Sequence, residues 1–167
     1  MKRVWCVVGA ALACSFLALA LIVGIRDRSL AAAPGQPPDA SSLSSSVLIS
    51  PEDLMKAIQS VKGEKPLTIF VGFQVLYPQA HVPSAEYIGP ASRQEYLEKL
   101  RKRVALLVHK RFIVLYCGCC PWNHCPNVRP AYEALHNLGF TNVKVLYIPN
   151  DFGRDWVNKG LPVEKGQ

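Results

Sequence analysis

Residues 112–129 of the 167-residue chain read FIVLYCGCCPWNHCPNVR, and this stretch decides the fold. Its first five residues form an apolar run rich in β-branched and aromatic side chains, which is typical of a buried strand. A loop rich in cysteine and proline follows. A helix then begins at about Val128 or Pro130 and ends at Gly139, a glycine in the usual left-handed stop position. The stretch therefore predicts a strand, a loop and a helix in direct succession.

The same alternation continues on both sides of this stretch. Apolar runs at residues 67–73 and 143–147 predict two more buried strands. Helices are expected at residues 51–61, after the N-cap Ser50, at 92–107, after the capping box of Ser92 and Glu95, and at 152–159, before Gly160. This order predicts a three-layer α/β domain with a mainly parallel central sheet and helices on both faces. Ligands of such sheets bind beyond the carboxyl ends of the strands, where the cysteine loop is expected.

The N-terminal part of the chain differs in composition from the rest. Residues 4–25 form an unbroken apolar run behind Lys2 and Arg3, which is long enough to cross a membrane. We interpret residues 1–33 as a signal peptide, cleaved after Ala31, or as an N-terminal membrane anchor. Residues 34–46, rich in Pro, Ser and Ala, are expected to form a flexible linker to the folded domain at 47–167. The domain is therefore expected outside the cytoplasm, periplasmic or secreted, and bound to the membrane if the N-terminal segment is not cleaved.

Composition limits the possible functions. The chain is 50% hydrophobic and 19% charged, which excludes a disordered protein, and its length allows one ordinary domain. It carries 19 basic and 12 acidic residues. The basic residues gather in and around the helix expected at 92–107, but no aromatic residues are interleaved with them. This pattern favours a solvated helix face, and no nucleic acid is expected as a partner.

Four of the six cysteines fall within residues 117–125. This clustering is unlike the spread-out disulfide framework of a small secreted domain, and it indicates chemistry instead. A cysteine at the end of a strand that faces a helix N-terminus meets backbone N–H groups and the positive end of the helix dipole, which stabilise a thiolate. A thiolate is the nucleophile of sulfur and disulfide chemistry. The cysteine loop is therefore the candidate reactive site.

Four segments of the domain resemble sequences of the rhodanese family, which includes thiosulfate and related sulfurtransferases. They are ISPEDL at residues 49–54, YPQAHVPSA at 77–85, IVLYC at 113–117 with AL at 134–135 and LGF at 138–140, and WVNKGLPV at 156–163. The segments occur in the family's order, and the resemblance extends over residues 47–166. It implies a rhodanese-like α/β fold for the whole domain.

The resemblance also implies roles for residues of the loop. Cys117 matches the family's nucleophile, which accepts a sulfane sulfur as a persulfide and passes it to a thiol or another acceptor. Backbone N–H groups of the loop would hold the transferred negative charge, and Arg129 would add a positive charge for an anionic donor. The rest of the expected substrate-binding loop consists of Gly118, Cys119, Trp122, His124 and Cys125. Eleven residues separate Cys117 from Arg129, about five more than in the family's anion-binding loop.

Other interpretations of the loop stay open. Cys117 and Cys120 form a C-x-x-C pair, in which one thiol attacks and its neighbour resolves the mixed disulfide. A thiol–disulfide oxidoreductase is therefore an alternative to sulfur transfer, and Cys120 is included among the expected catalytic residues. Further alternatives are metal binding by Cys117, Cys120, His124 and Cys125, and a disulfide-pinned loop in an inactive redox- or metal-responsive binding module. The favoured interpretation needs a small sulfur donor and a thiol acceptor, which can be a thiol-containing protein, and no cofactor or resident metal.

Overall fold

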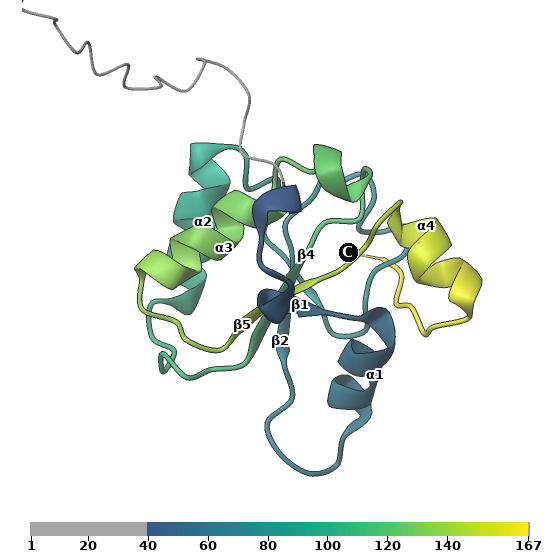
Figure 1. The fold of residues 1–167 in the computed structure, drawn as a ribbon, viewed down its shortest axis with the longest axis horizontal. Helices are drawn as coiled ribbons and strands as arrows, with labels where there is room; N and C mark the ends of the chain where they lie inside the picture. Colours follow the sequence, from purple (N-terminus) through teal and green to yellow (C-terminus); the bar gives the residue numbers. More distant parts are fainter. Residues whose placement is uncertain (1–39, 167) are drawn as a thin grey trace, which may run out of the picture. The chain divides into compact units, whose positions relative to one another are not determined.

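The structure, a computed structural model, describes residues 40–166, which contain a five-stranded parallel sheet (Figure 1). The strands are β1 (Leu48–Ile49), β2 (Leu67–Phe70), β3 (Glu86–Tyr87), β4 (Ile113–Tyr116) and β5 (Val143–Leu146). Their order across the sheet is β1-β5-β4-β2-β3, so β4 is the central strand. The three predicted buried strands are confirmed. The two-residue strands β1 and β3 are too short to leave a pattern in the sequence.

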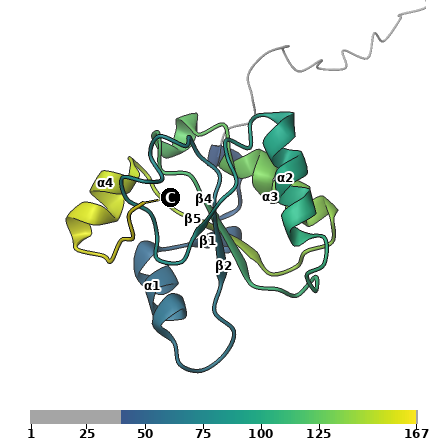
Figure 2. The same ribbon diagram turned by 180° about the vertical axis from the view of Figure 1, so that it is seen from behind.

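Helices cover both faces of this sheet (Figures 1 and 2). They are α1 (Pro51–Gln59), α2 (Gln94–Val104), α3 (Val128–Asn137) and α4 (Phe152–Asp155), together with the 3-10 turns η1 (Ala40–Ser42), η2 (Ser45–Val47), η3 (Trp122–His124) and η4 (Val157–Lys159). Buried residues of α2 and α3 pack in one core cluster, and those of α1 pack with Trp156, next to α4, in the other. The predicted arrangement of three layers is therefore confirmed.

The side chains of β4 explain why its sequence is apolar throughout. Ile113 and Leu115 pack beneath α2 and α3, whereas Val114 and Tyr116 pack beneath α1 and α4. All four side chains are fully buried. Because successive strand residues face opposite sides, a strand covered on both faces is apolar at every position. The next residue, Cys117, continues the alternation and joins the cluster on the side of α2 and α3.

Helix starts and ends agree with most of the sequence signals. The Ser50 hydroxyl accepts a hydrogen bond from Asp53 N–H at 3.1 Å and so caps α1 as predicted. Gly139 follows α3 with a positive φ of 86°. The capping box predicted at Ser92 is wrong, because α2 begins at Gln94 without a side-chain cap. The Ser92 N–H instead donates to Asn127 Oδ1 at 3.0 Å, so a tertiary contact has replaced the local cap.

Residues 40–46 differ from the flexible linker expected at 34–46, because they lie against the domain. Ala40 is fully buried in the core cluster of α2 and α3, and Leu43 packs against the same cluster. Lys144 Nζ donates to the Ser46 carbonyl at 2.6 Å. The side chains of Ala40 and Leu43 and hydrogen bonds from Lys144 and Arg129 thus hold a segment whose composition is typical of a linker. The predicted signal or anchor at 1–33 and the rest of the linker lie outside the described residues.

Among residues 40–166, no helix is long and apolar enough to cross a membrane.

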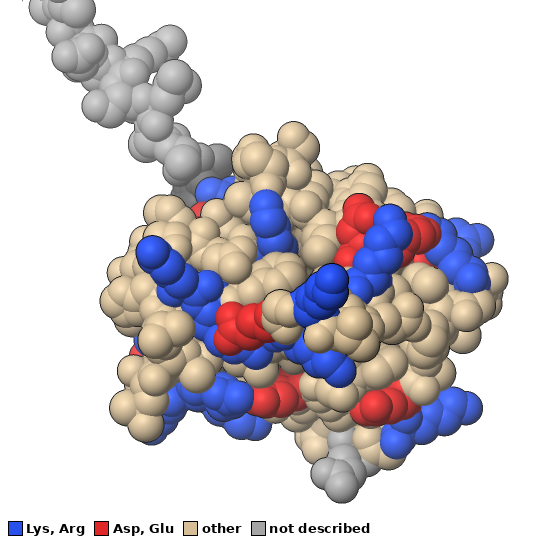
Figure 3. Space-filling view, turned by 90° about the horizontal axis from the view of Figure 1, so that it is seen from below, with Lys and Arg blue, Asp and Glu red and all other residues tan. Residues whose placement is uncertain are grey.

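Two of the four basic residues of α2 have acidic partners. Arg103 pairs with Glu86 at 2.6 Å, and Arg101 pairs with Glu98 at 2.8 Å. On the face of the molecule in Figure 3, acidic side chains lie among the basic ones. Paired charges of opposite sign weaken the local electric field, so this face carries a mixed charge pattern rather than a continuous basic stripe.

Candidate functional site

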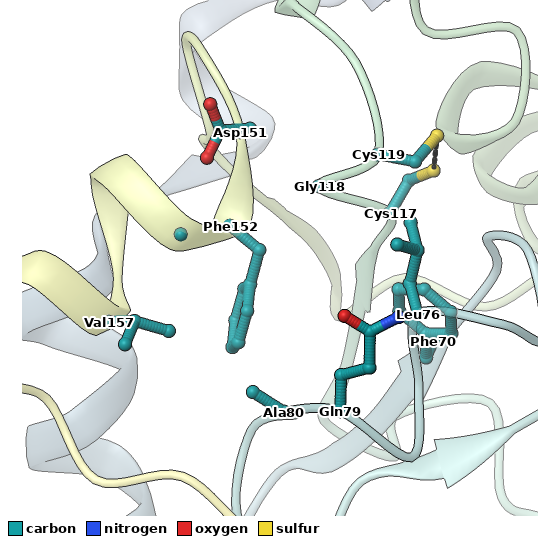
Figure 4. A pocket seen from close by; sticks show the side chains of 11 residues that line it. Phe70, Leu76, Gln79, Ala80, Cys117, Gly118, Cys119, Asp151, Phe152 and Val157 are labelled. Carbon is teal, nitrogen blue, oxygen red and sulfur yellow. Dashed lines mark hydrogen bonds between the residues drawn. The ribbon is translucent and has the colours of Figure 1, made fainter.

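The cysteine loop borders a cavity at the carboxyl end of β4 (Figure 4). Cys117 and Cys119 lie on one side of the cavity, and Phe152 and Val157 lie on the opposite side. Phe70 and the turn at residues 76–80 complete the lining. The volume is about 260 Å³, which suits a small molecule or the end of an extended side chain. The cavity lies at the edge of the sheet where the sequence predicts the ligand site.

Cys117 follows β4 directly, and its side chain is buried at the base of the loop. Its Sγ lies 2.9 Å from the Sγ of Cys119 and accepts a hydrogen bond from Asn127 Nδ2 at 3.4 Å. Hydrogen bonding to the thiols of Cys119, Cys120 and Cys125, together with burial, raises the pKa of Cys117 well above its ordinary value. The structure therefore favours the protonated thiol at Cys117 in the resting state.

Cys125 has the opposite electrostatic environment. It precedes α3 and is buried, but hydrogen bonds from the thiols of Cys117 and Cys119 and from the backbone N–H groups of Asn127 and Val128 outweigh its desolvation. Together they lower the pKa of Cys125 to about 3. The environment expected to favour a thiolate at Cys117 thus lowers the pKa of Cys125 instead, whereas the pKa of Cys117 is raised. The long loop explains this difference, because it brings a second cysteine to the start of α3.

The four thiols of the loop form one cluster. Cys119 Sγ and Cys120 Sγ are 3.4 Å apart, and Cys125 is buried in the same core cluster as Cys117, with Cys119 and Cys120 packed against it. None of these four cysteines forms a disulfide. The two sulfurs of the expected pair, Cys117 and Cys120, each contact the sulfur of Cys119. Within residues 40–166, no group of His, Cys, Asp and Glu side chains has the arrangement of a metal site.

Gly118 lets the loop approach α4 closely. Its φ is +70°, in the region that favours glycine, and its carbonyl accepts a hydrogen bond from Phe152 N–H at 3.0 Å. A Cβ at this position would lie 2.8 Å from the Cβ of Phe152. Gly118, which lines the cavity, therefore lets the cysteine loop lie directly against α4.

The other predicted loop residues have different positions. Trp122 packs edge-to-face against Tyr147, with ring centroids 5.2 Å apart, so its ring fills space beside the loop and does not line the cavity. His124 is exposed, and its backbone oxygen, rather than its ring, accepts a hydrogen bond from Cys120. The rings of Trp122 and His124 therefore do not line the cavity beside Cys117 and Cys119.

Arg129 is not brought to the cavity. Its Nε donates to Glu133 Oε1 at 2.7 Å, one turn further along α3, and its Nη1 donates to the Ser42 hydroxyl. The guanidinium thus connects α3 to the segment at residues 40–46. The positive charge predicted for an anionic donor is used in these contacts instead.

Asn127 is a residue of the site that the sequence analysis does not identify. It is fully buried, and its amide connects two elements: Nδ2 donates to Cys117 Sγ, and Oδ1 accepts from Ser92 N–H. Its backbone N–H also contributes to the lowered pKa of Cys125. The available signal is an asparagine directly before a predicted helix, which indicates an N-cap. In the structure its side chain makes no capping bond and orients the thiols instead.

Comparisons with known proteins bear on the fold. No protein-family model matches the sequence, and no curated protein matches it. The structure is similar to the crystal structure of the Alr3790 protein from Anabaena sp., with a TM-score of 0.54 and 17% sequence identity over 71% of this chain and 82% of that one. A solution structure of the rhodanese-like domain of the same protein gives a TM-score of 0.51 and 17% identity over 72% of this chain and 80% of that one.

A thiosulfate sulfurtransferase from Pseudomonas aeruginosa is also similar in structure. The TM-score is 0.52 and the identity 22%, over 80% of this chain and 21% of that one. The chain thus spans about a fifth of the length of that sulfurtransferase. At these identities the similarity concerns the fold, and it agrees with the parallel sheet, the two helical layers and the cysteine loop after the central strand. The described part of the chain is therefore a domain of rhodanese-like fold, as the sequence resemblance predicts.

Proposed function

We propose that the domain is a thiol-dependent sulfurtransferase in which Cys117 carries the sulfur. The observation that supports this most strongly is the position of Cys117: it directly follows the central strand of a rhodanese-like fold and lines the cavity. A sulfane sulfur that enters the cavity can meet this sulfur atom. No other thiol of the cluster except Cys119 lines the cavity.

The thiol cluster supports a balanced reaction. In the first step, Cys117 Sγ forms a bond to the sulfane sulfur of the donor and the donor leaves with the electron pair of its broken S–S bond. The proton of Cys117 leaves with the donor fragment, which carries the electron pair of the broken S–S bond. In the second step, an acceptor thiolate attacks the outer sulfur of the persulfide, and the electron pair of that bond returns to Cys117. The two steps move one sulfur atom and involve no net oxidation of the domain.

Intact-mass spectrometry of the reduced chain after exposure to a sulfane-sulfur donor tests this proposal. We expect the chain to gain one sulfur atom in the presence of the donor and to lose it when an acceptor thiol is added. Cys117→Ser is expected to gain none, whereas the control Trp122→Phe, beside the same loop, is expected to behave like the wild type. A Cys117→Ser chain that gains sulfur as the wild type does contradicts the proposal.

A second candidate is dithiol–disulfide exchange, which the 2.9 Å distance between the sulfurs of Cys117 and Cys119 favours. This function predicts a chain that loses two hydrogen atoms in an oxidising thiol buffer, regains them with a reductant and never gains sulfur. The same mass measurement therefore distinguishes the two functions. In the second case the partner is a thiol-containing protein, and in the first it is a small sulfur donor together with a thiol acceptor.

We also propose that the domain works outside the cytoplasm, on the basis of the apolar run at residues 4–25 behind Lys2 and Arg3. A fusion of residues 1–46 to a reporter enzyme that is active only outside the cytoplasm tests this. An active reporter is expected, and an inactive reporter retained in the cytoplasm contradicts the proposal.

A further inference from the structure

We propose that the sulfur donor of this domain is an uncharged hydropersulfide with an apolar organic group, and that anionic donors are disfavoured. This inference rests on the proposed function and deepens it, because it names the class of molecule that loads Cys117. The chemistry of the cavity that Cys117 lines determines the preference. Thiosulfate, a dianion, belongs to the disfavoured class.

Apolar side chains form much of the cavity lining. Phe152 and Val157 lie on the side of α4, and Leu76 and Ala80 belong to the turn at residues 76–80 (Figure 4). Phe70 at the end of β2 completes this apolar lining. Contact with such walls removes the apolar part of a ligand from water, which favours binding of an alkyl or aromatic group. The cavity therefore selects a donor by its apolar part.

The cavity lining has no positive charge to compensate an anion. Among the described residues that line it there is no Lys, Arg or His, and the charged side chain is the Asp151 carboxylate. Arg129, the residue expected to serve an anionic donor, is bonded to Glu133 and Ser42 instead. A charged group that leaves water without a partner of opposite charge binds unfavourably, and a nearby charge of the same sign adds repulsion. An anionic donor is therefore disfavoured.

Backbone N–H groups at the start of α4 already have partners. Asp151 Oδ1 accepts a hydrogen bond from Arg154 N–H at 2.8 Å, and the Gly118 carbonyl accepts one from Phe152 N–H at 3.0 Å. Unpaired N–H groups at the start of a helix are the groups that ordinarily bind an anion. Because these two donate within the domain, they are not available to an anionic donor.

The size of the cavity and the surface beside it also suit an apolar group. The volume of about 260 Å³ lies just below the roughly 300–1,000 Å³ of pockets for drug-sized ligands. Phe73 and Val75, which precede the turn at residues 76–80, are 50% and 68% exposed, and Val157 is 39% exposed. Exposed apolar side chains thus occur on both of the segments that form the walls, so the apolar character of the cavity continues on its surroundings.

Transfer from a hydropersulfide, written RS–SH, balances without an oxidant or a reductant. Cys117 Sγ forms a bond to the outer sulfur of RS–SH, and the S–S bond of the donor breaks. The RS fragment leaves with the electron pair of that bond and takes the proton of the Cys117 thiol, which gives the neutral thiol RSH. The outer sulfur keeps its own hydrogen and stays on Cys117 as a persulfide. No net charge enters or leaves the cavity, which suits a thiol whose pKa is raised by hydrogen bonding to neighbouring thiols and by burial.

Two donors of the same shape but different charge test this preference. Isobutyl hydropersulfide ends in methyl groups where carboxymethyl hydropersulfide has the oxygens of a carboxylate. The reduced full-length chain in detergent is mixed with each donor, and the rate at which Cys117 gains sulfur is followed by peptide mass spectrometry. Each rate is divided by the rate of the same donor with a small free thiol in the same detergent. We expect the isobutyl donor to load Cys117 at least about tenfold faster, which corresponds to about 1.4 kcal/mol in the barrier.

A positive charge placed in the cavity wall tests the physical reason for the preference. Val157→Lys adds a cation to the lining, whereas the control Asn158→Lys adds the same charge at the adjacent exposed residue, which does not line the cavity. We expect Val157→Lys to reduce the ratio of the two rates by a factor of at least about three, because the cation attracts the carboxylate. Asn158→Lys is expected to keep the wild-type ratio.

The outcomes distinguish the donor class from the proposed function. Equal rates for the two donors in the wild type, faster loading by the carboxymethyl donor, or loading by thiosulfate alone would refute the donor class, while sulfur transfer by Cys117 stands. If neither hydropersulfide nor thiosulfate loads the chain, the proposed function itself fails, and the donor class fails with it. A ratio that changes as much in Asn158→Lys as in Val157→Lys would also refute the proposal, because the overall charge of the domain would then set the preference. The comparison of donors uses the wild type, so it remains decisive even if a variant does not fold.

Discussion

Replacement of Asn127 by alanine tests whether this residue fixes the thiol cluster in place. The Asn127 amide donates to Cys117 Sγ and accepts from Ser92 N–H, and its side chain is fully buried. Each lost hydrogen bond costs about 1 kcal/mol, because the weak sulfur acceptor and the half-buried N–H both lie in the lower part of the usual range. A void of roughly 40 Å³ left by the amide adds about 1 kcal/mol at the usual cost per volume. The expected loss of unfolding free energy is therefore about 3 kcal/mol.

Urea unfolding of the reduced protein, followed by tryptophan fluorescence, measures this loss. With a slope of about 1.5 kcal/mol per molar for a domain of this size, we expect the midpoint to fall by about 2 M. The matched control is Asn123→Ala, an exposed asparagine in the same loop, for which a change within about 0.5 kcal/mol is expected. If Asn127→Ala lowers the stability no more than Asn123→Ala does, the hydrogen bonds of the Asn127 amide do not hold the cysteine loop to the rest of the domain.

Two further predictions concern the same loop. Gly118→Ala is expected to lower the unfolding free energy by at least about 2 kcal/mol, because it combines a left-handed backbone with a collision against Phe152. Gly160→Ala has a similar backbone but open space around it, and it is expected to lower the unfolding free energy by only about 1 kcal/mol. Equal urea midpoints for the two variants would refute the close approach of α4 to Gly118. The pKa of Cys125 is lowered in the folded domain by hydrogen bonds from the thiols of Cys117 and Cys119 and from backbone N–H groups. The stability it contributes is therefore complete above the ordinary thiol pKa and is lost as the pH falls toward the folded value. As the pH falls from about 8 to about 5, the unfolding free energy of the reduced wild type should decrease more than that of Cys125→Ser. If the unfolding free energies of the two proteins change with pH in parallel, the pKa of Cys125 is not lowered by folding.

The fold could be predicted largely because its signals are local. The run from Ile113 to Tyr116 is apolar at every position, as a strand covered on both faces must be, and Ser50 and Gly139 mark helix ends by their own chemistry. The same reasoning failed at Ser92, because its N–H is bonded to a residue 35 positions away in the sequence. It also failed at Ala40, whose burial depends on the surface presented by other elements.

The candidate site could be predicted only in part. The position of Cys117 at the end of the central strand follows from the sequence pattern and from the family resemblance. The path of the long loop decides which cysteine lies near the backbone N–H groups at the start of α3 and has its pKa lowered by them. The sequence offers four cysteines for this position and does not distinguish among them. Arg129 is directed away from the cavity by Glu133 and Ser42, and the sequence pattern does not show that these contacts compete with a ligand.

The most direct test of the central claim is to identify the atom that carries the sulfur. The wild-type chain, reduced and then exposed to a sulfane-sulfur donor, is alkylated and cut into peptides, and the mass of each cysteine side chain is measured. Our account predicts an added sulfur on Cys117 and ordinary alkylated thiols at Cys119 and Cys120. An added sulfur on Cys119 or Cys120, with Cys117 unmodified, would contradict it.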